Sequence, residues 1–268
     1  MIIVIIFLTI LLLYTLAVMG RKGHPGLRNL RGWSYAHRGL HGNGVPENSM
    51  AAFRAALEAG YGIELDIHLL KDGSLAVMHD AALVRTTGCE GKIEDLTADQ
   101  LTNYHLEGTE ETIPTFQEVL ALYAGKAPLI IELKSEDNNY AAICEAACKA
   151  MDGYEGPWCM ESFDPRCIYW LRRNRPNIIR GQLSRNFVID KSVTLHPLLK
   201  FGVTHQLGNF LLMPDFVAYR FADRKTLGNF LVRKFWGVQG VSWTLRSQVD
   251  YDIAVAEGWL PIFESFQP

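Results

Sequence analysis

The chain has 268 residues, of which 49% are hydrophobic and 21% are charged, enough for one large folded domain or two small ones. A net charge of −3 and basic runs of no more than two residues argue against a nucleic-acid-binding surface. The five cysteines include no CxxC pair, and Cys144 and Cys148, in an alanine-rich segment, are interpreted as small buried residues rather than metal ligands.

The first nineteen residues carry no charge and are followed by Gly20, Arg21 and Lys22. At a rise of about 1.5 Å per residue, a helix of this length just spans a bilayer core of about 30 Å. A basic start and small residues before a cleavage point are both poorly represented, so an anchor is favoured over a cleaved signal or a core helix. Because the nearby positive charges follow the segment, the rest of the chain is expected to be cytoplasmic. We therefore expect a single-pass membrane protein with an anchor (1–19), a linker (20–32) and a catalytic domain (33–268).

Beyond the linker, nine short apolar runs alternate with segments of helical character. The runs lie at 33–37, 61–70, 74–80, 127–134, 158–162, 178–184, 215–221, 240–246 and 260–265. Strands that alternate with helices are typical of a parallel sheet with helical crossovers.

Three of the intervening helices have recognisable N-caps. Asn48 or Ser49 is expected to cap the first, Thr115 with Glu118 forms a capping box, and Asp164 precedes a proline at the first turn.

Nine strands are one too many for a (β/α)8 barrel, and the surplus strand can be located. Only Lys71-Asp72-Gly73 separates the runs 61–70 and 74–80. Parallel neighbours need a crossover of about a dozen residues or more, so these two runs should form an antiparallel hairpin. The sequence therefore predicts a TIM barrel with a small insertion after strand 2, at approximately 68–112, which returns His79 to the barrel mouth.

Polar side chains stand at the carboxyl ends of the predicted strands, where barrel enzymes build their active sites. Glu64 with Asp66, and Glu132 with Lys134, are i, i+2 pairs that share one face of a strand. A charged pair on a strand buried on both faces is costly unless it faces a site. The residues expected at this rim are His37, Arg38, Glu64, Asp66, His79, Glu132, Lys134, Glu161, Ser162, Asp164 and Trp243.

These residue types favour phosphate-ester chemistry. Three converging carboxylates, Glu64, Asp66 and Glu132, form a hard-oxygen cage suited to one divalent ion, Ca²⁺ or Mg²⁺. Arg38 and Lys134 can hold a phosphate. Two histidines can exchange protons near neutral pH.

Two further residues are open to two interpretations. His68, two residues beyond Asp66, either serves the site or packs in the core, and packing is favoured. Glu47 is either a carboxylate at a helix start, which is the favoured interpretation, or a contact of the site.

These motifs resemble those of the glycerophosphodiester phosphodiesterase family. The matching stretches run in order over residues 35 to about 265: HRG (37–39), PEN (46–48), ELD (64–66), KDG (71–73), HD (79–80), RTTG (85–88), IP (113–114), IELK (131–134), SFDP (162–165) and WTL (243–245). The resemblance implies a TIM barrel with an insertion after strand 2. It also implies hydrolysis of a glycerophosphodiester to glycerol 3-phosphate and an alcohol, by direct attack of water or through a cyclic intermediate.

The resemblance also implies a role for each residue. Glu64, Asp66 and Glu132 would hold the divalent metal, and His37 and His79 would be the acid and base. Arg38 and Lys134 would bind the phosphate, and we group Trp243 with them as a substrate contact.

Three regions depart from the family pattern. Trp243-Thr244-Leu245-Arg246 stands where the family usually has WTVN. The final strand end carries the residues FES (263–265) in place of an aspartate, and the middle region around 195–221 is unusually apolar. The segment 201–213 is either a groove for a lipid tail or an ordinary barrel helix and loop. The alternative functions are therefore a lysophospholipase D-like or phospholipase C-like enzyme acting on a lysophospholipid, or a non-catalytic binding barrel at the membrane.

Overall fold

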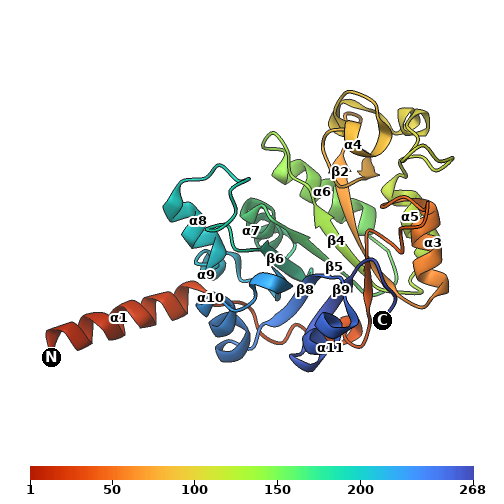
Figure 1. Ribbon diagram of the computed structural model, residues 1–268. Coiled ribbons are helices and arrows are strands. Elements are labelled where there is room, and N and C mark those ends of the chain that lie inside the picture. The colour runs from red at the N-terminus through yellow and green to blue at the C-terminus, as the bar shows by residue number, and fades with distance from the viewer.

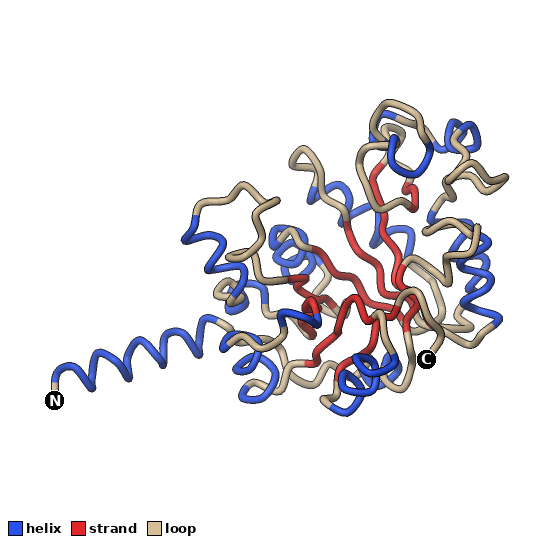
Figure 2. Tube along the Cα trace, viewed as in Figure 1, coloured by secondary structure: helices blue, strands red, loops and turns tan.

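Eight parallel strands close into a barrel in the computed structural model, which describes residues 1–268 (Figures 1 and 2). Closure is made by the first strand, which pairs with both the second and the last. The strands are β1 Tyr35–His37, β2 Gly62–Leu69, β4 Leu129–Leu133, β5 Trp158–Ser162, β6 Arg180–Ser184, β7 Phe216–Arg220, β8 Gln239–Leu245 and β9 Trp259–Phe263, with β3 Leu75–Val77 outside the ring. The predicted (β/α)8 barrel is confirmed.

Helices follow most of the strands and cover the outside of the ring (Figure 1). The α-helices of the barrel are α2 Leu27–Leu30, α3 Met50–Glu58, α5 Phe116–Tyr123, α6 Tyr140–Met151, α7 Pro165–Asn174, α8 Pro197–Thr204, α9 Asn209–Leu212, α10 Leu227–Phe230 and α11 Gln248–Ala256. Short 3₁₀ or π segments occur at η3 Phe221–Asp223 and η4 Leu231–Phe235. Cys144 and Cys148 are buried in α6, as expected.

The predicted caps are present. Ser49 accepts a hydrogen bond from Ala52 N at 3.1 Å, Thr115 and Glu118 form the reciprocal capping box, and Asp164 accepts one from Arg166 N at 2.9 Å. Each satisfies backbone donors that would otherwise be left unpaired at a helix start. These caps fix where the chain turns from the barrel mouth into the outer helices.

The ninth strand forms the expected hairpin. β3 runs antiparallel to β2, with Ile67 opposite Val77, and Gly73 takes a left-handed conformation (φ +84°) in the turn between them. The segment beyond β3 contains α4 Val84–Thr87, η1 Ile93–Asp95 and η2 Ala98–Asn103. Nine buried residues of this region form a hydrophobic cluster separate from the main core: Leu70, Ala76, Met78, Leu83, Ile93, Leu96, Leu101, Leu106 and Ile113. The insertion therefore has a small core of its own.

The prediction of a transmembrane anchor is not supported. α1 covers only Ile2–Ala17, sixteen residues, and no helix in the structure is both long enough and apolar enough to cross a membrane. At about 1.5 Å per residue this helix is roughly 24 Å long, less than a bilayer core. The end of the apolar run packs against the rest of the protein, since Val18 is buried. The cytoplasmic placement depended on that anchor and remains only a prediction.

α1 projects from the barrel beside α9 and α10 (Figure 1). Its C-terminal end is held by two side-chain contacts: Tyr14 Oη lies 2.6 Å from His205 Nδ1, and Trp236 Nε1 donates to the Thr15 carbonyl at 2.7 Å. The following segment closes the amino end of the barrel, where Leu27 and Leu30 of α2 are buried and the Leu30 carbonyl accepts a hydrogen bond from Tyr35 Oη.

An ion pair between a half-buried arginine and a buried aspartate fastens this segment to the barrel. Arg21 donates to both carboxylate oxygens of Asp215, which is fully buried and also accepts from Arg180 N at 3.0 Å. Arg180 is also buried and lies 3.9 Å from Asp215, so removing the carboxylate leaves a buried guanidinium without its counter-charge.

We expect Asp215→Ala to lower the free energy of unfolding by about 3–5 kcal/mol, measured by urea denaturation. Asp152 pairs with Arg175 at 3.7 Å on the surface, and Asp152→Ala should cost less than about 1 kcal/mol. Equal small losses in both variants would show that the Arg21–Asp215 pair contributes little.

Candidate active site

Three buried carboxylates meet at the carboxyl ends of β2 and β4. The register sets Asp66 directly beside Glu132, and Glu64 lies two residues earlier on the same face of β2. One oxygen from each of Glu64, Asp66 and Glu132 lies within 4.8 Å of the other two. All three predicted metal ligands are therefore brought together.

The protonation of the three groups differs because their neighbours differ. Burial raises the pKa of Glu64 well above its usual value, and the charges of Asp66 and Glu132 add to that effect. Burial also raises the pKa of Glu132, to about 7, against the opposing charge of Lys134. For Asp66, burial is outweighed by Lys134, His79 and Arg38, which hold its pKa well below the usual range. Asp66 is thus held in its charged form, whereas Glu64 and Glu132 tend to keep a proton unless a cation offsets their charge.

Two cations border the carboxylates. Lys134 Nζ lies 2.9 Å from Asp66 Oδ1 and 2.8 Å from Glu132 Oε1, and these charges raise its pKa although burial opposes them. Arg38 Nε lies 3.5 Å from Asp66 Oδ2, and its Nη1 donates to Glu47 Oε1 at 2.9 Å. Both are placed where a phosphate at the cluster would be within reach of a positive charge.

The backbone bend after β1 explains why a glycine follows Arg38 in the HRG motif (37–39). Arg38 has φ +56° and Gly39 has φ +81°, and a Cβ on Gly39 would meet Ala52 Cβ at 2.8 Å. Only glycine suits this combination of a left-handed conformation and a close approach to α3. The bend turns the chain across the barrel mouth, and Arg38 N donates to the Glu64 carbonyl at 2.8 Å.

His37 lies between two carboxylates. Its Nε2 is 3.8 Å from Glu64 Oε2, and its Nδ1 is 3.4 Å from Glu264 Oε2. Burial lowers the pKa of the imidazole, while Glu264 acts in the opposite direction. His37 Nδ1 makes no hydrogen bond, so Glu264 acts on the ring through its charge, while Nε2 faces Glu64.

His79 reaches the same site from the hairpin. Its Nδ1 contacts Asp80 Oδ1, and Asp80 also pairs with Arg85. Burial lowers the pKa of His79 to about 4, and the charges of Asp66, Lys134 and Arg38 all act on it. Both histidines therefore have Nδ1 at a carboxylate, which leaves Nε2 for another partner.

The residues present fit a divalent cation. Beside Glu132 in the register lies Glu161 on β5, a fourth buried carboxylate, whose Oε2 has no hydrogen-bond partner in the protein. Burial and the charges of Glu132 and Asp66 raise its pKa well above the usual value. Burying several carboxylates without enough counter-charge is unfavourable, and an oxygen-coordinated cation such as Ca²⁺ or Mg²⁺ would compensate for it.

Several residues contribute that the sequence did not assign to the site. Glu264 was interpreted only as a departure from the family pattern, yet it contacts His37 and, at 3.6 Å, His41. Asn48 Nδ2 donates to Asp66 Oδ2 at 2.9 Å. The PEN motif was the available signal for Asn48; nothing in the sequence indicated the contact of Glu264.

The two residues with open interpretations are now placed. Glu47 contacts Arg38 and Arg85 rather than the first turn of α3, so the favoured helix-start interpretation is wrong. His68 is buried, with Nδ1 2.6 Å from Glu94 Oε1 and Nε2 3.2 Å from the His79 carbonyl oxygen. His68 therefore contacts Glu94 and the backbone at His79 rather than Glu64, Asp66 or Glu132.

Trp243 lies at the carboxyl end of β8, at the same rim. Its ring packs edge-on against Phe163 at 5.6 Å, and its indole Nε1 is buried with no partner in the protein. That N–H group is free to donate to a ligand.

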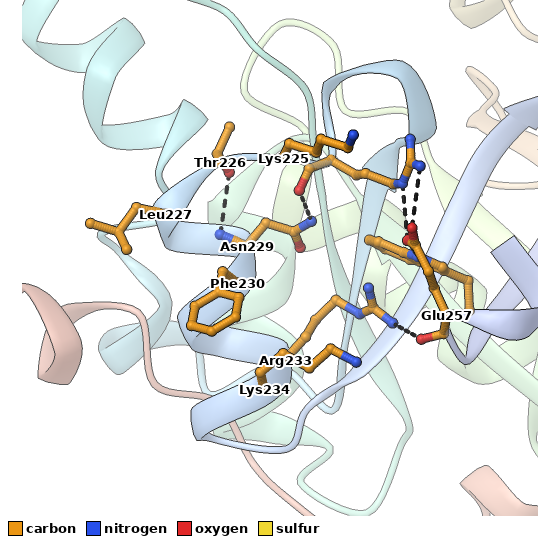
Figure 3. A pocket seen from close by; sticks show the side chains of 10 residues that line it. Lys225, Thr226, Leu227, Asn229, Phe230, Arg233, Lys234 and Glu257 are labelled. Carbon is orange, nitrogen blue, oxygen red and sulfur yellow. Dashed lines mark hydrogen bonds and ion pairs between the residues drawn. The ribbon is translucent and has the colours of Figure 1, made fainter. Parts of the chain in front are cut away.

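A second pocket lies outside the site described above (Figure 3). Its volume is about 370 Å³, and it is lined by the loop before α10, by α10 and η4, and by the start of β9. Arg224 pairs with the Glu257 carboxylate and Arg233 donates to the Glu257 carbonyl, so two of its cations are already engaged. It contains none of the predicted site residues.

A parallel barrel with acids, imidazoles and cations gathered at its carboxyl rim has the architecture of a TIM-barrel enzyme. Residues 37–258 match the model of the glycerophosphoryl diester phosphodiesterase family. A glycerophosphodiester phosphodiesterase of Bacillus altitudinis is 31% identical over 209 residues, which cover 74% of this chain and 85% of that protein. Another from Caldanaerobacter subterraneus is 35% identical over 180 residues, covering 60% and 74%.

Solved structures share the fold at lower identity. A phosphodiesterase of Oleispira antarctica, in complex with the product sn-glycerol-3-phosphate, superposes with a TM-score of 0.70 at 20% identity, covering 87% of this chain and 92% of that one. A glycerophosphodiester phosphodiesterase of Thermotoga maritima gives 0.67 at 23% identity, covering 86% and 93%. The chain belongs to the glycerophosphoryl diester phosphodiesterase family, and it is an enzyme of that class.

Proposed function

We propose that this chain hydrolyses glycerophosphodiesters to glycerol 3-phosphate and an alcohol with the help of one divalent cation, Ca²⁺ or Mg²⁺. The observation that carries the proposal is the meeting of three carboxylates, two imidazoles and two cations at one rim, although their residues come from distant parts of the chain. These groups supply the functions that cleavage of a phosphate ester requires: charge neutralisation, phosphate binding and proton transfer.

The proposed roles follow the geometry. Glu64, Asp66 and Glu132 would hold the cation, which when bound would withdraw charge from the phosphate oxygens. Arg38 and Lys134 bind and orient the phosphate, and Trp243 offers its indole N–H to the substrate. One imidazole accepts a proton from the attacking hydroxyl or water, and the other donates a proton to the leaving alcohol.

The carboxylates behind the histidines position them. Glu264 lies at Nδ1 of His37 and Asp80 at Nδ1 of His79. Each contact favours the tautomer that carries its proton on Nδ1, so that Nε2 can take up a proton at the reacting atoms.

A substrate panel tests the proposal. We expect glycerophosphocholine, glycerophosphoethanolamine or glycerophosphoglycerol to release glycerol 3-phosphate, measured by coupling to glycerol-3-phosphate dehydrogenase with added Ca²⁺ or Mg²⁺. p-Nitrophenyl phosphate, a monoester, is the control and should be hydrolysed far more slowly. If the monoester is the only substrate hydrolysed, the diesterase proposal is wrong.

A further inference from the structure

A cavity of about 630 Å³ opens directly from the catalytic rim. His79 and Lys134 line its inner end, so it is continuous with the proposed phosphate position. One wall is formed by residues at and beyond the ends of β5 and β6, including Phe163 and Leu183, and the other by α8 and α9. The volume lies in the range of small-molecule sites, roughly 300–1,000 Å³. Space beyond the phosphate is therefore available to another part of the substrate.

The part of the cavity beyond the rim is mainly apolar. Leu195, Leu199, Val203 and Leu212 line it from the side of α8 and α9. Arg185 lies over the rings of Phe163 and Phe187 and pairs with Asp190 at 3.0 Å. Its charge is thus already compensated, and the lining favours a hydrocarbon group over a charged one.

Three buried amide side chains in this cavity each have one polar atom without a hydrogen-bond partner. Gln206 Nε2, Asn209 Oδ1 and Gln182 Oε1 make no hydrogen bond, although the residues are only 3%, 1% and 7% exposed. Unsatisfied buried polar groups are unfavourable unless a ligand or water completes them. An amide donor together with amide acceptors suits an ester carbonyl and a free hydroxyl, the groups of a monoacylated glycerol.

The outer end of the cavity leads to an apolar surface. Leu199 lines the cavity and is 59% exposed, and Phe201 of α8 and Phe210 and Leu211 of α9 are exposed nearby in the sequence. A chain entering from solvent would therefore remain in contact with apolar side chains as far as the catalytic rim. Such a path serves no purpose for a small hydrophilic alcohol.

We infer that this groove binds the acyl chain of a monoacyl glycerophosphodiester, a lysophospholipid. The inference rests on the proposed phosphodiesterase function and specifies its substrate class. The phosphate lies at the rim, the ester and hydroxyl of the glycerol meet the amides of Gln182, Gln206 and Asn209, and the hydrocarbon chain runs along α8.

Kinetics with a chain-length series test the inference. The substrates are glycerophosphocholine and its hexanoyl, octanoyl, decanoyl and lauroyl monoesters, each below its critical micelle concentration. Burial of each methylene should raise kcat/KM by about fourfold until the groove is filled, so the four additional methylenes of the decanoyl ester should raise it over the hexanoyl ester by about 250-fold.

Gly202 offers a way to fill the groove. It lines the cavity in α8, and a Cβ built on it meets no atom within 4 Å. We expect Gly202→Phe to lower the ratio of kcat/KM for the lauroyl ester to that for glycerophosphocholine by about tenfold or more. Leu198→Phe adds the same ring at an exposed position of α8 outside the cavity and should leave the ratio unchanged. Leu199→Asp, at the exposed mouth, is a second variant that should also lower it.

Binding provides a readout that does not depend on turnover. Calorimetry with dodecylphosphocholine below its critical micelle concentration, in the presence of a chelator, should show saturable binding to the unmodified chain and to Leu198→Phe but not to Gly202→Phe. A flat chain-length series and no saturable binding, with glycerophosphocholine still hydrolysed, would overturn the groove and leave the proposed function intact. If no diester is hydrolysed, the proposed function fails, and the binding measurement alone decides whether the groove takes a chain.

Discussion

Replacement of His37 or His79 by alanine is expected to lower kcat for glycerophosphodiesters by about 10²-fold or more, because each removes one proton-transfer group. Both side chains sit at the rim and are only partly exposed, so the fold should survive. The measurement is steady-state release of glycerol 3-phosphate, together with circular dichroism of each variant.

His105 supplies the matched control. It is exposed in the insertion, where its Nδ1 lies 3.0 Å from the Thr109 carbonyl oxygen, and His105→Ala should retain the original rate. Near-normal rates for both His37→Ala and His79→Ala would refute the acid and base assignment.

Removal of divalent metal is expected to reduce turnover to the background rate. Without a cation, burial and the neighbouring charges raise the pKa of Glu64 and Glu132, so these groups tend to hold protons, and the phosphate would lack the positive charge that a bound metal supplies. Activity should disappear with EDTA and return when Ca²⁺ or Mg²⁺ is added in excess, and a comparison of the two restored rates would identify the preferred ion.

Thermal stability gives an independent check on metal binding. A ligand present at about 100 times its Kd stabilises the folded state by about 2.7 kcal/mol, so the metal should raise the Tm. That increase should be lost in Glu132→Gln and kept in Glu110→Gln, which alters an exposed carboxylate. Full activity in EDTA would remove the carboxylate cluster from the mechanism.

The strand order and most of the rim could be predicted from the sequence because those features are local. Asp72-Gly73 between two apolar runs requires a tight turn, and that turn alone separates the hairpin strand from the eight barrel strands. The i, i+2 spacing of Glu64 and Asp66 fixes their common face, whatever the tertiary structure.

The contacts that sequence reasoning missed are those between strands distant in the chain. Glu264 approaches His37 because β9 pairs with β1, and no pattern within residues 260–265 contains that pairing. The role of Glu47 likewise depends on where Arg38 and Arg85 point. The anchor was overestimated because hydropathy shows that a run is apolar but not where its helix ends, and Val18 packs against the protein.

The separate core of the insertion has a consequence for how this enzyme loses activity. His79 is supplied by the segment that follows the hairpin, whereas His37, Glu64 and Glu132 are supplied by the ring. A unit with its own small core can open while the remainder stays folded. Mild denaturant or heat would then inactivate the enzyme by moving His79 away from the site while the eight barrel strands stay paired. Activity would return fully when native conditions are restored.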